Sequence, residues 1–148
     1  MPTLGTALTP GQLHKGSCWT LNADVQGYAR SHGNGLATQA CAGRGFRVLT
    51  NPHPNASRVR TALIEDGYPC WIAIDDLTNE AIARSNWSPR LLDAASIQER
   101  LPLVLHWLNN AAQIPNTYLW GGTIGPDLDC SGLVQTAFAS QSIWLPRD

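Results

Sequence analysis

Runs of like charge and long apolar stretches are both missing from this sequence of 148 residues. The formal net charge is −1 and 14% of the residues are charged, so no basic patch points to nucleic acid or to an anionic membrane surface. The longest apolar stretches fall well short of the roughly 20 residues that span a bilayer. With 43% hydrophobic residues, the composition is that of a globular protein, and neither nucleic acid nor a membrane is expected as a partner.

Closely spaced cysteines and an N-terminal leader pattern are also lacking. The cysteines at positions 18, 41, 70 and 130 include no CxxC pair, which argues against a structural zinc site. Residues 1–8 have no basic start and no sustained apolar core, so the sequence predicts a cytoplasmic protein without a secretory signal. Free thiols are expected in that compartment. A disulfide between Cys18 and Cys41 is an alternative that no sequence pattern supports.

Short apolar segments separated by turn residues occupy the first half of the chain. Arg58 and Arg60 alternate with Val59 and Thr61, as in a half-buried strand with one polar face. Strands are expected within residues 19–29, 44–50, 59–64 and 70–74. Short strands at this density, with turn residues between them, predict a small β-barrel or sandwich.

Helical spacing replaces this pattern after a polar connector at residues 75–89. Six apolar residues recur at helical intervals, namely Ile97, Leu101, Val104, Leu105, Leu108 and Ala112. Ser96 and Glu99 match a capping box, whereas Pro102 conflicts with a helix interior. Of the two alternatives, a helix kinked at Pro102 or a later start, we expect the helix to begin near Leu101.

A second helix is expected from Cys130 to about Ser140, with Asp129 as its N-cap. Val134, Ala137 and Phe138 then share its buried face. A helix N-terminus carries roughly half a positive charge, which favours a thiolate over a thiol. Cys130 is therefore a candidate nucleophile for covalent catalysis.

The usual base for such a nucleophile does not follow it in the sequence. The four histidines, His14, His32, His53 and His106, all precede Cys130. Acyl transfer also needs a proton donor for the leaving amine. We expect His106 to be a surface or partly buried helix residue rather than the catalytic base.

The segments Tyr118–Gly122 and Asp129–Gln135 resemble the NlpC/p60 family of bacterial cell-wall cysteine peptidases. Ile143–Asp148 is similar to the next motif of that family, although Ser142 stands where glycine is usual. The β-rich first half, with Tyr68-Pro69 and Trp71, is similar to the bacterial SH3-like domain of two-domain members, particularly the cyanobacterial type.

The resemblance implies an α+β protein in which an SH3-like β-barrel (1–78) and a linker (79–95) precede the helical part of a papain-like catalytic domain (96–148). It implies hydrolysis of the γ-D-glutamyl to L-diamino acid bond in peptidoglycan stem peptides that have a free N-terminus, as in cell-wall recycling. It implies no metal and no organic cofactor.

Site residues follow from the same resemblance, position by position. Cys130 would be the nucleophile, and its backbone N–H with the Tyr118 hydroxyl would form the oxyanion hole. Asp129, Ser131 and Tyr68 would bind the substrate. Arg147 matches the family's arginine, with no role assigned to it, and Trp120 is expected in the core.

In the family, the catalytic histidine lies downstream of the Leu-Pro-Arg motif, and this sequence has no residue beyond Asp148. We therefore expect this chain alone to be inactive, with a poorly folded C-terminal third. Two alternatives stay open. One is a binding module for muropeptides or a protein partner, followed by a decayed peptidase domain. The other is a structural protein in which the motif occurs by chance.

Overall fold

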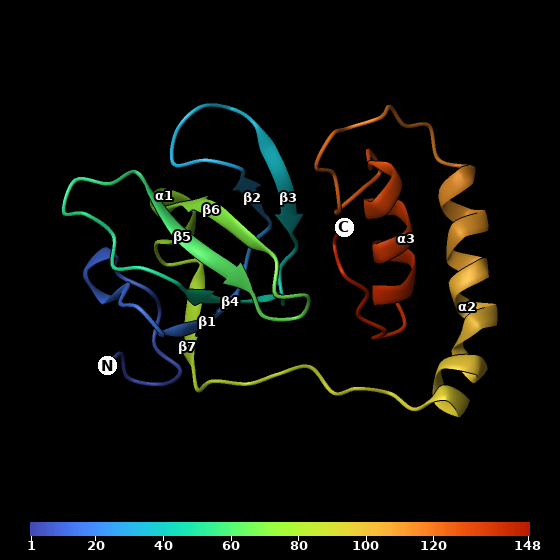
Figure 1. Ribbon diagram of the computed structural model, residues 1–148, viewed down its shortest axis with the longest axis horizontal. Coiled ribbons are helices and arrows are strands. Elements are labelled where there is room, and N and C mark those ends of the chain that lie inside the picture. The colour runs from blue at the N-terminus through green and yellow to red at the C-terminus, as the bar shows by residue number, and fades with distance from the viewer.

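A computed structural model describes residues 1–148 and shows two parts side by side, a β-rich half and a pair of helices (Figure 1). Residues 85–93 form an extended connection between the two parts. The predicted α+β class is confirmed. No helix combines the length and the apolar composition needed to cross a bilayer.

The β-rich half is a single antiparallel sheet of seven strands, in the order β3-β2-β6-β5-β4-β1-β7. Its strands are β1 (Cys18–Leu21), β2 (Val25–Tyr28), β3 (Leu36–Ala40), β4 (Gly45–Val48), β5 (Arg58–Leu63), β6 (Pro69–Ala73) and β7 (Ala81–Arg84). The short 3-10 helix Pro10–Gln12 precedes the sheet, and α1 (Ile74–Leu77) links β6 to β7. The four regions predicted as strands overlap β1, β2, β4, β5 and β6, of which β1, β5 and β6 begin one residue earlier than predicted.

The sequence analysis missed strands β3 and β7. β7 lies inside the segment predicted as a linker (79–95), yet it pairs with β1 along its whole length, from Cys18↔Arg84 to Leu21↔Ala81. Its inward residues are Ala81 and Ala83, which are fully buried but have low strand propensity. Partner strands therefore determine this element more than its own sequence does. The domain boundaries stay a prediction.

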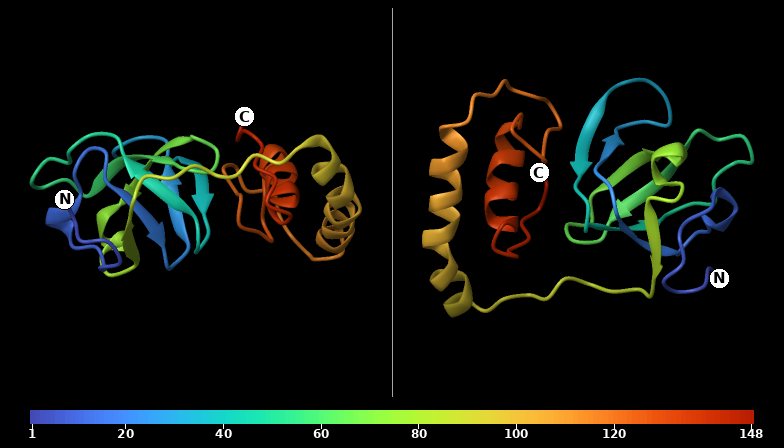
Figure 2. Two further views of the ribbon diagram at one scale, coloured as in Figure 1. Left: turned by 90° about the horizontal axis from the view of Figure 1, so that it is seen from below. Right: turned by 180° about the vertical axis from the view of Figure 1, so that it is seen from behind.

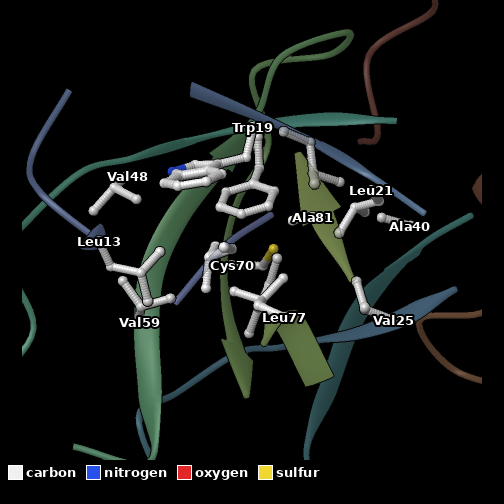
Figure 3. Packing of buried hydrophobic residues seen from close by; sticks show 14 of the residues in the cluster. Leu13, Trp19, Leu21, Val25, Ala40, Val48, Val59, Cys70, Leu77 and Ala81 are labelled. Carbon is white, nitrogen blue, oxygen red and sulfur yellow. The ribbon is translucent and has the colours of Figure 1, made fainter. Parts of the chain in front are cut away.

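One hydrophobic core of 15 buried residues stabilises the sheet (Figure 3). Trp19, Phe46 and Leu63 are completely buried in it. Because a large apolar side chain gains about 1.5–3 kcal/mol when it is fully buried, this cluster is a major source of stability for the β-rich half. The arrangement agrees with the predicted SH3-like domain.

The first long helix, α2 (Ala94–Ala112), begins earlier than predicted. Asp93 is its N-cap and accepts a hydrogen bond from the Ser96 N–H at 2.8 Å, so the expected start near Leu101 is wrong. Pro102 lies inside the helix and its side chain is exposed. A proline removes one backbone donor, but the cap and the packing of the helix on α3 compensate for that loss.

The second long helix, α3 (Cys130–Ala139), lies between the sheet and α2 (Figures 1 and 2). Asp129 caps it as predicted. Val104, Ala137 and Ile143 form a small core between the two helices, and Phe138 packs against them. Val134 was expected on the same face but is 47% exposed, because it lies on the side of α3 that nothing covers.

The expectation that Trp120 belongs to the core is also wrong, since its side chain is 74% exposed. In this turn the backbone packs on the sheet instead. Gly121 has a φ of +86°, and a Cβ there would approach the side chain of Leu36 on β3 to 2.8 Å. A glycine is needed for this contact, and the neighbouring indole then points outward.

Candidate active site

Cys130 is the first residue of α3, and its side chain is exposed. The other thiols are free as well, which agrees with the prediction from the sequence. A groove of about 260 Å³ opens beside Cys130. Its lining residues come from α2, α3 and the loop between them: Leu108, Ala111, Ala112, Asn116, Tyr118, Pro126, Leu128, Asp129, Cys130 and Leu133.

Tyr118 lines the same groove and is 63% exposed. Desolvation raises the pKa of the Tyr118 phenol, and the adjacent Cys130 thiol and Asp129 carboxylate raise it further. The phenol therefore keeps its proton at neutral pH and can donate a hydrogen bond. The structure thus brings together three predicted site residues: Cys130, Tyr118 and Asp129.

Glycines shape the backbone directly behind the nucleophile. A Cβ on Gly132, in the first turn of α3, would lie 2.0 Å from the Gly122 carbonyl oxygen. That same carbonyl accepts a hydrogen bond from the Asp129 N–H at 3.2 Å. The Gly-Gly turn therefore packs directly against the N-terminus of α3, and only glycine at position 132 permits this approach.

The Asp129 carboxylate is buried and accepts hydrogen bonds at both oxygens. Oδ1 accepts from the Gly132 N–H at 2.7 Å, and Oδ2 accepts from the Gly121 N–H at 2.8 Å. The Arg147 guanidinium donates to both, at 3.0 Å and 2.5 Å. Burial opposes ionisation, but these hydrogen bonds outweigh it and hold the pKa of the Asp129 carboxyl below its ordinary value.

Arg147 is the site residue to which the sequence analysis assigned no role. It is 3% exposed, and besides Asp129 it donates to the Ser131 hydroxyl at 2.5 Å and to the Ala37 carbonyl on β3 at 3.3 Å. The sequence analysis identified Arg147 only because it is the arginine of the Leu-Pro-Arg motif. One guanidinium therefore joins the cap of α3, the residue after the nucleophile and the edge of the sheet.

Tyr68 lies in the turn before β6 and does not line the groove. Burial raises the pKa of its phenol, and the nearby Asp148 carboxylate raises it further, while the Arg147 charge lowers it. The structure therefore places Tyr68 beside the C-terminal residues that hold α3. Ser131 does not line the groove either, although it is adjacent to Cys130.

Polar side chains join the helices to the sheet, and no sequence motif identified them. Gln39 on β3 and Thr123 form three hydrogen bonds with each other. The Gln39 N–H donates to Thr123 Oγ1 at 3.0 Å, and the Thr123 N–H donates to Gln39 Oε1 at 3.0 Å. The Thr123 hydroxyl in turn donates to the Gln39 carbonyl at 2.7 Å. Gln135 of α3 donates to Asp66 at 2.9 Å. These contacts fix the position of the candidate site relative to the β-rich half.

No histidine is among the residues that line the groove. His106 lies exposed on α2, where its Nε2 is 3.1 Å from the Asn110 side-chain nitrogen. This position agrees with the expected surface role of His106.

Two family models match parts of this chain. Residues 27–77 match the family model described as the bacterial dipeptidyl-peptidase Sh3 domain, and residues 115–148 match the NlpC/P60 family. The resemblance seen in the sequence is thereby confirmed. A comparison with curated proteins gives no match.

Solved structures give weak likenesses. NlpC2 from Trichomonas vaginalis is 14% identical, with 90% of this chain and 70% of that chain covered and a TM-score of 0.40. NlpC1 from the same organism is 13% identical, with 99% and 70% covered and a TM-score of 0.41. An NlpC/P60 family protein from Bacillus cereus is 19% identical, with 90% and 39% covered and a TM-score of 0.28. The resemblance to the NlpC/P60 family is supported by the two family-model matches.

Proposed function

Because this chain joins a bacterial SH3-type domain to an NlpC/P60 segment, which indicates a peptidoglycan-related cysteine peptidase, we propose that it supplies the nucleophile of such a peptidase. We propose the γ-D-glutamyl to L-diamino acid bond of stem peptides with a free N-terminus as its substrate. One observation carries the proposal. An exposed cysteine begins α3 beside a groove that is also lined by Tyr118 and by Asp129, the N-cap of that helix.

In the proposed reaction, the Cys130 thiolate attacks the γ-carbonyl carbon of the D-glutamyl residue. Negative charge then develops on the carbonyl oxygen. The Cys130 backbone N–H and the Tyr118 hydroxyl are the proposed donors to that oxygen, and each such donor typically accounts for about 3 kcal/mol of transition-state stabilisation. Collapse of the intermediate breaks the C–N bond, expels the diamino acid amine as it takes up a proton, and leaves a thioester on Cys130, which water hydrolyses. Because no histidine lines the groove, that proton has to come from water or from an acid outside the groove.

Asp129, Ser131 and Tyr68 are the proposed substrate-binding residues. The contacts of Asp129 refine its part in this proposal. Its carboxylate already accepts hydrogen bonds from two backbone N–H groups and from Arg147, and it forms an ion pair with that arginine. We therefore propose that Asp129 acts on a substrate amine mainly by orienting the first turn of α3. The cytoplasmic location and the role in wall recycling stay predictions of the sequence.

Covalent capture tests the proposal without requiring turnover. An L-Ala-γ-D-Glu analogue with an electrophilic nitrile at the γ-carbon is expected to add one adduct mass to the chain at Cys130. The Cys130→Ala variant should gain no adduct, and the α-linked D-Glu isomer should react far more slowly. Modification of Cys41 at the same rate as Cys130, or equal reaction of both isomers, would contradict the proposal.

A second candidate function is a binding module that holds stem peptides without cleaving them. The observation that favours it is the groove itself, which contains no histidine to act as general base or acid. This candidate predicts that the chain binds the dipeptide with unchanged affinity in Cys130→Ala and never forms the nitrile adduct. Calorimetry and intact-mass spectrometry on the same samples separate the two candidates.

A further inference from the structure

A row of cationic and aromatic side chains crosses the outer face of the sheet, in the β-rich half. Tyr28 on β2, Trp71 on β6 and Arg60 on β5 are direct cross-strand neighbours, in that order. The buried Val59 and Thr61 flank Arg60 along β5, so its side chain projects away from the core. The alternation in the sequence predicted this polar face of β5. Arg60 and Trp71 belong neither to the hydrophobic core of the β-rich half nor to the lining of the groove beside Cys130.

A hollow of about 600 Å³ lies over this row, and none of its lining residues belongs to the groove beside Cys130. The lining consists of Ser31, Thr50, Asn51, Pro52, His53, Asn55, Ala56, Ser57, Arg58, Arg60 and Trp71. It contains no carboxylate. Five of these residues are Ser, Thr or Asn, whose neutral side chains can form hydrogen bonds; His53 adds an imidazole and Trp71 an indole ring.

The two arginines that line the hollow, Arg58 and Arg60, differ in their contacts. Arg58 donates to the Arg30 and Gly33 carbonyls, at 3.1 and 2.7 Å, and lies 3.6 Å from the centroid of the Tyr28 ring. It therefore holds the loop that borders the hollow. Arg60 is exposed, and the ion pairs of the structure involve only Arg44 and Arg147. The guanidinium of Arg60 is thus available to an outside anion.

We propose that this hollow, defined by Arg60 and Trp71, binds an acidic sugar unit of a saccharide. One free guanidinium matches a single carboxylate, which it can bind through two parallel hydrogen bonds. The partly exposed Trp71 offers an apolar face to the sugar ring. The neutral Ser, Thr and Asn side chains supply donors and acceptors for its hydroxyl groups. A polyphosphate or nucleic acid would require more than one free cation and is not favoured.

Titration of the ¹⁵N-labelled chain, followed by two-dimensional NMR, tests this site. We expect a glucuronic acid oligosaccharide or N-acetylmuramic acid to shift the Trp71 indole N–H and the amides of β5, whereas N-acetylglucosamine should bind at least about tenfold more weakly. The first two ligands differ in whether the carboxylate is on the ring or on a lactyl ether, so their relative affinities identify the source of the acidic sugar. Arg60→Gln and Trp71→Ala should each weaken binding by about tenfold or more.

Arg90→Gln is the matched control, because Arg90 is also exposed but lies in the extended connection. This variant and Cys130→Ala should bind as the unchanged chain does, which separates this site from the proposed peptidase function. Trp71→Phe keeps an aromatic face and should retain part of the affinity if Trp71→Ala disturbs the fold. Equal binding of the neutral sugar, binding of inorganic phosphate in place of the acidic sugars, or no shift with any saccharide would overturn the proposal.

Discussion

The two halves of this molecule are stabilised in different ways. The β-rich half has a core of 15 buried residues, whereas the helical pair has a core of three. Exposed apolar side chains on α2 and α3, among them Leu105 and Val134, show how little of the helical surface is buried. Polar and ionic contacts to the sheet compensate, through Gln39–Thr123, Gln135–Asp66 and Arg147. The geometry of the candidate site therefore depends on the polar interface between the helical pair and the sheet.

The largest effect is expected from a cavity in the main core. Phe46→Ala should lower the free energy of unfolding by about 3–5 kcal/mol, because Phe46 is completely buried among the strands. Since the helices rest on the sheet, both halves should unfold together. Thermal melts followed by far-ultraviolet circular dichroism measure the change.

Ile143→Val provides the matched comparison in the small core and should cost about 0.5–1.5 kcal/mol. If the strands of Phe46→Ala melted while its helical circular dichroism signal remained, the helices would not depend on the sheet.

The next effect concerns the ion pair at the site. Arg147→Met should destabilise the helical half by about 3–5 kcal/mol, because it leaves the buried Asp129 carboxylate without its counter-charge. Hydrogen exchange should show faster opening of α3 and unchanged protection of β5. The double variant Arg147→Met with Asp129→Asn should recover part of the loss, since no charge then remains unpaired. Equal loss of protection in α3 and β5 would contradict a local role.

This comparison also explains which parts of the molecule the sequence could predict. Strong local patterns located β5 and the cap of α3, because alternation and an Asp before an apolar helix are local features. β7, with its two small alanines, and the true start of α2 at Ala94 depend on neighbouring elements and were missed.

The candidate site divides in the same way. The motif residues Cys130, Tyr118 and Asp129 were identified from the sequence and lie together. Gln39 and Thr123, which hold the site on the sheet, are 84 residues apart and belong to no motif, so only the structure reveals them.

A smaller effect is expected where glycine permits a close approach. Gly132→Ala should cost about 1–3 kcal/mol, because the new methyl group would press on the Gly122 carbonyl and move the first turn of α3. Alkylation of Cys130 by iodoacetamide at neutral pH should slow as its helix N-terminus is displaced. Gly11→Ala is the control, since a Cβ at that position meets nothing within 4 Å. Unchanged stability and alkylation in Gly132→Ala would show that the turn can yield without affecting the site.

The smallest and most selective effect is expected in acid. The pKa of Asp129 in the folded chain is lower than its ordinary value of 3.8, so its contribution to stability is fully present above that value and is lost as the pH falls below it. The β-rich half also contains buried carboxylates, Glu65 and Asp66, in ion pairs with Arg44, but its 15-residue core contributes apolar burial that does not change with pH. Amide protection of α3 should therefore decrease at a higher pH than that of β5 when the pH is lowered from 6 to 2. The Asp129→Asn variant should lose this difference, because its side chain does not titrate. Simultaneous loss of protection in both elements of the unchanged chain would mean that the polar interface is not what distinguishes the two halves.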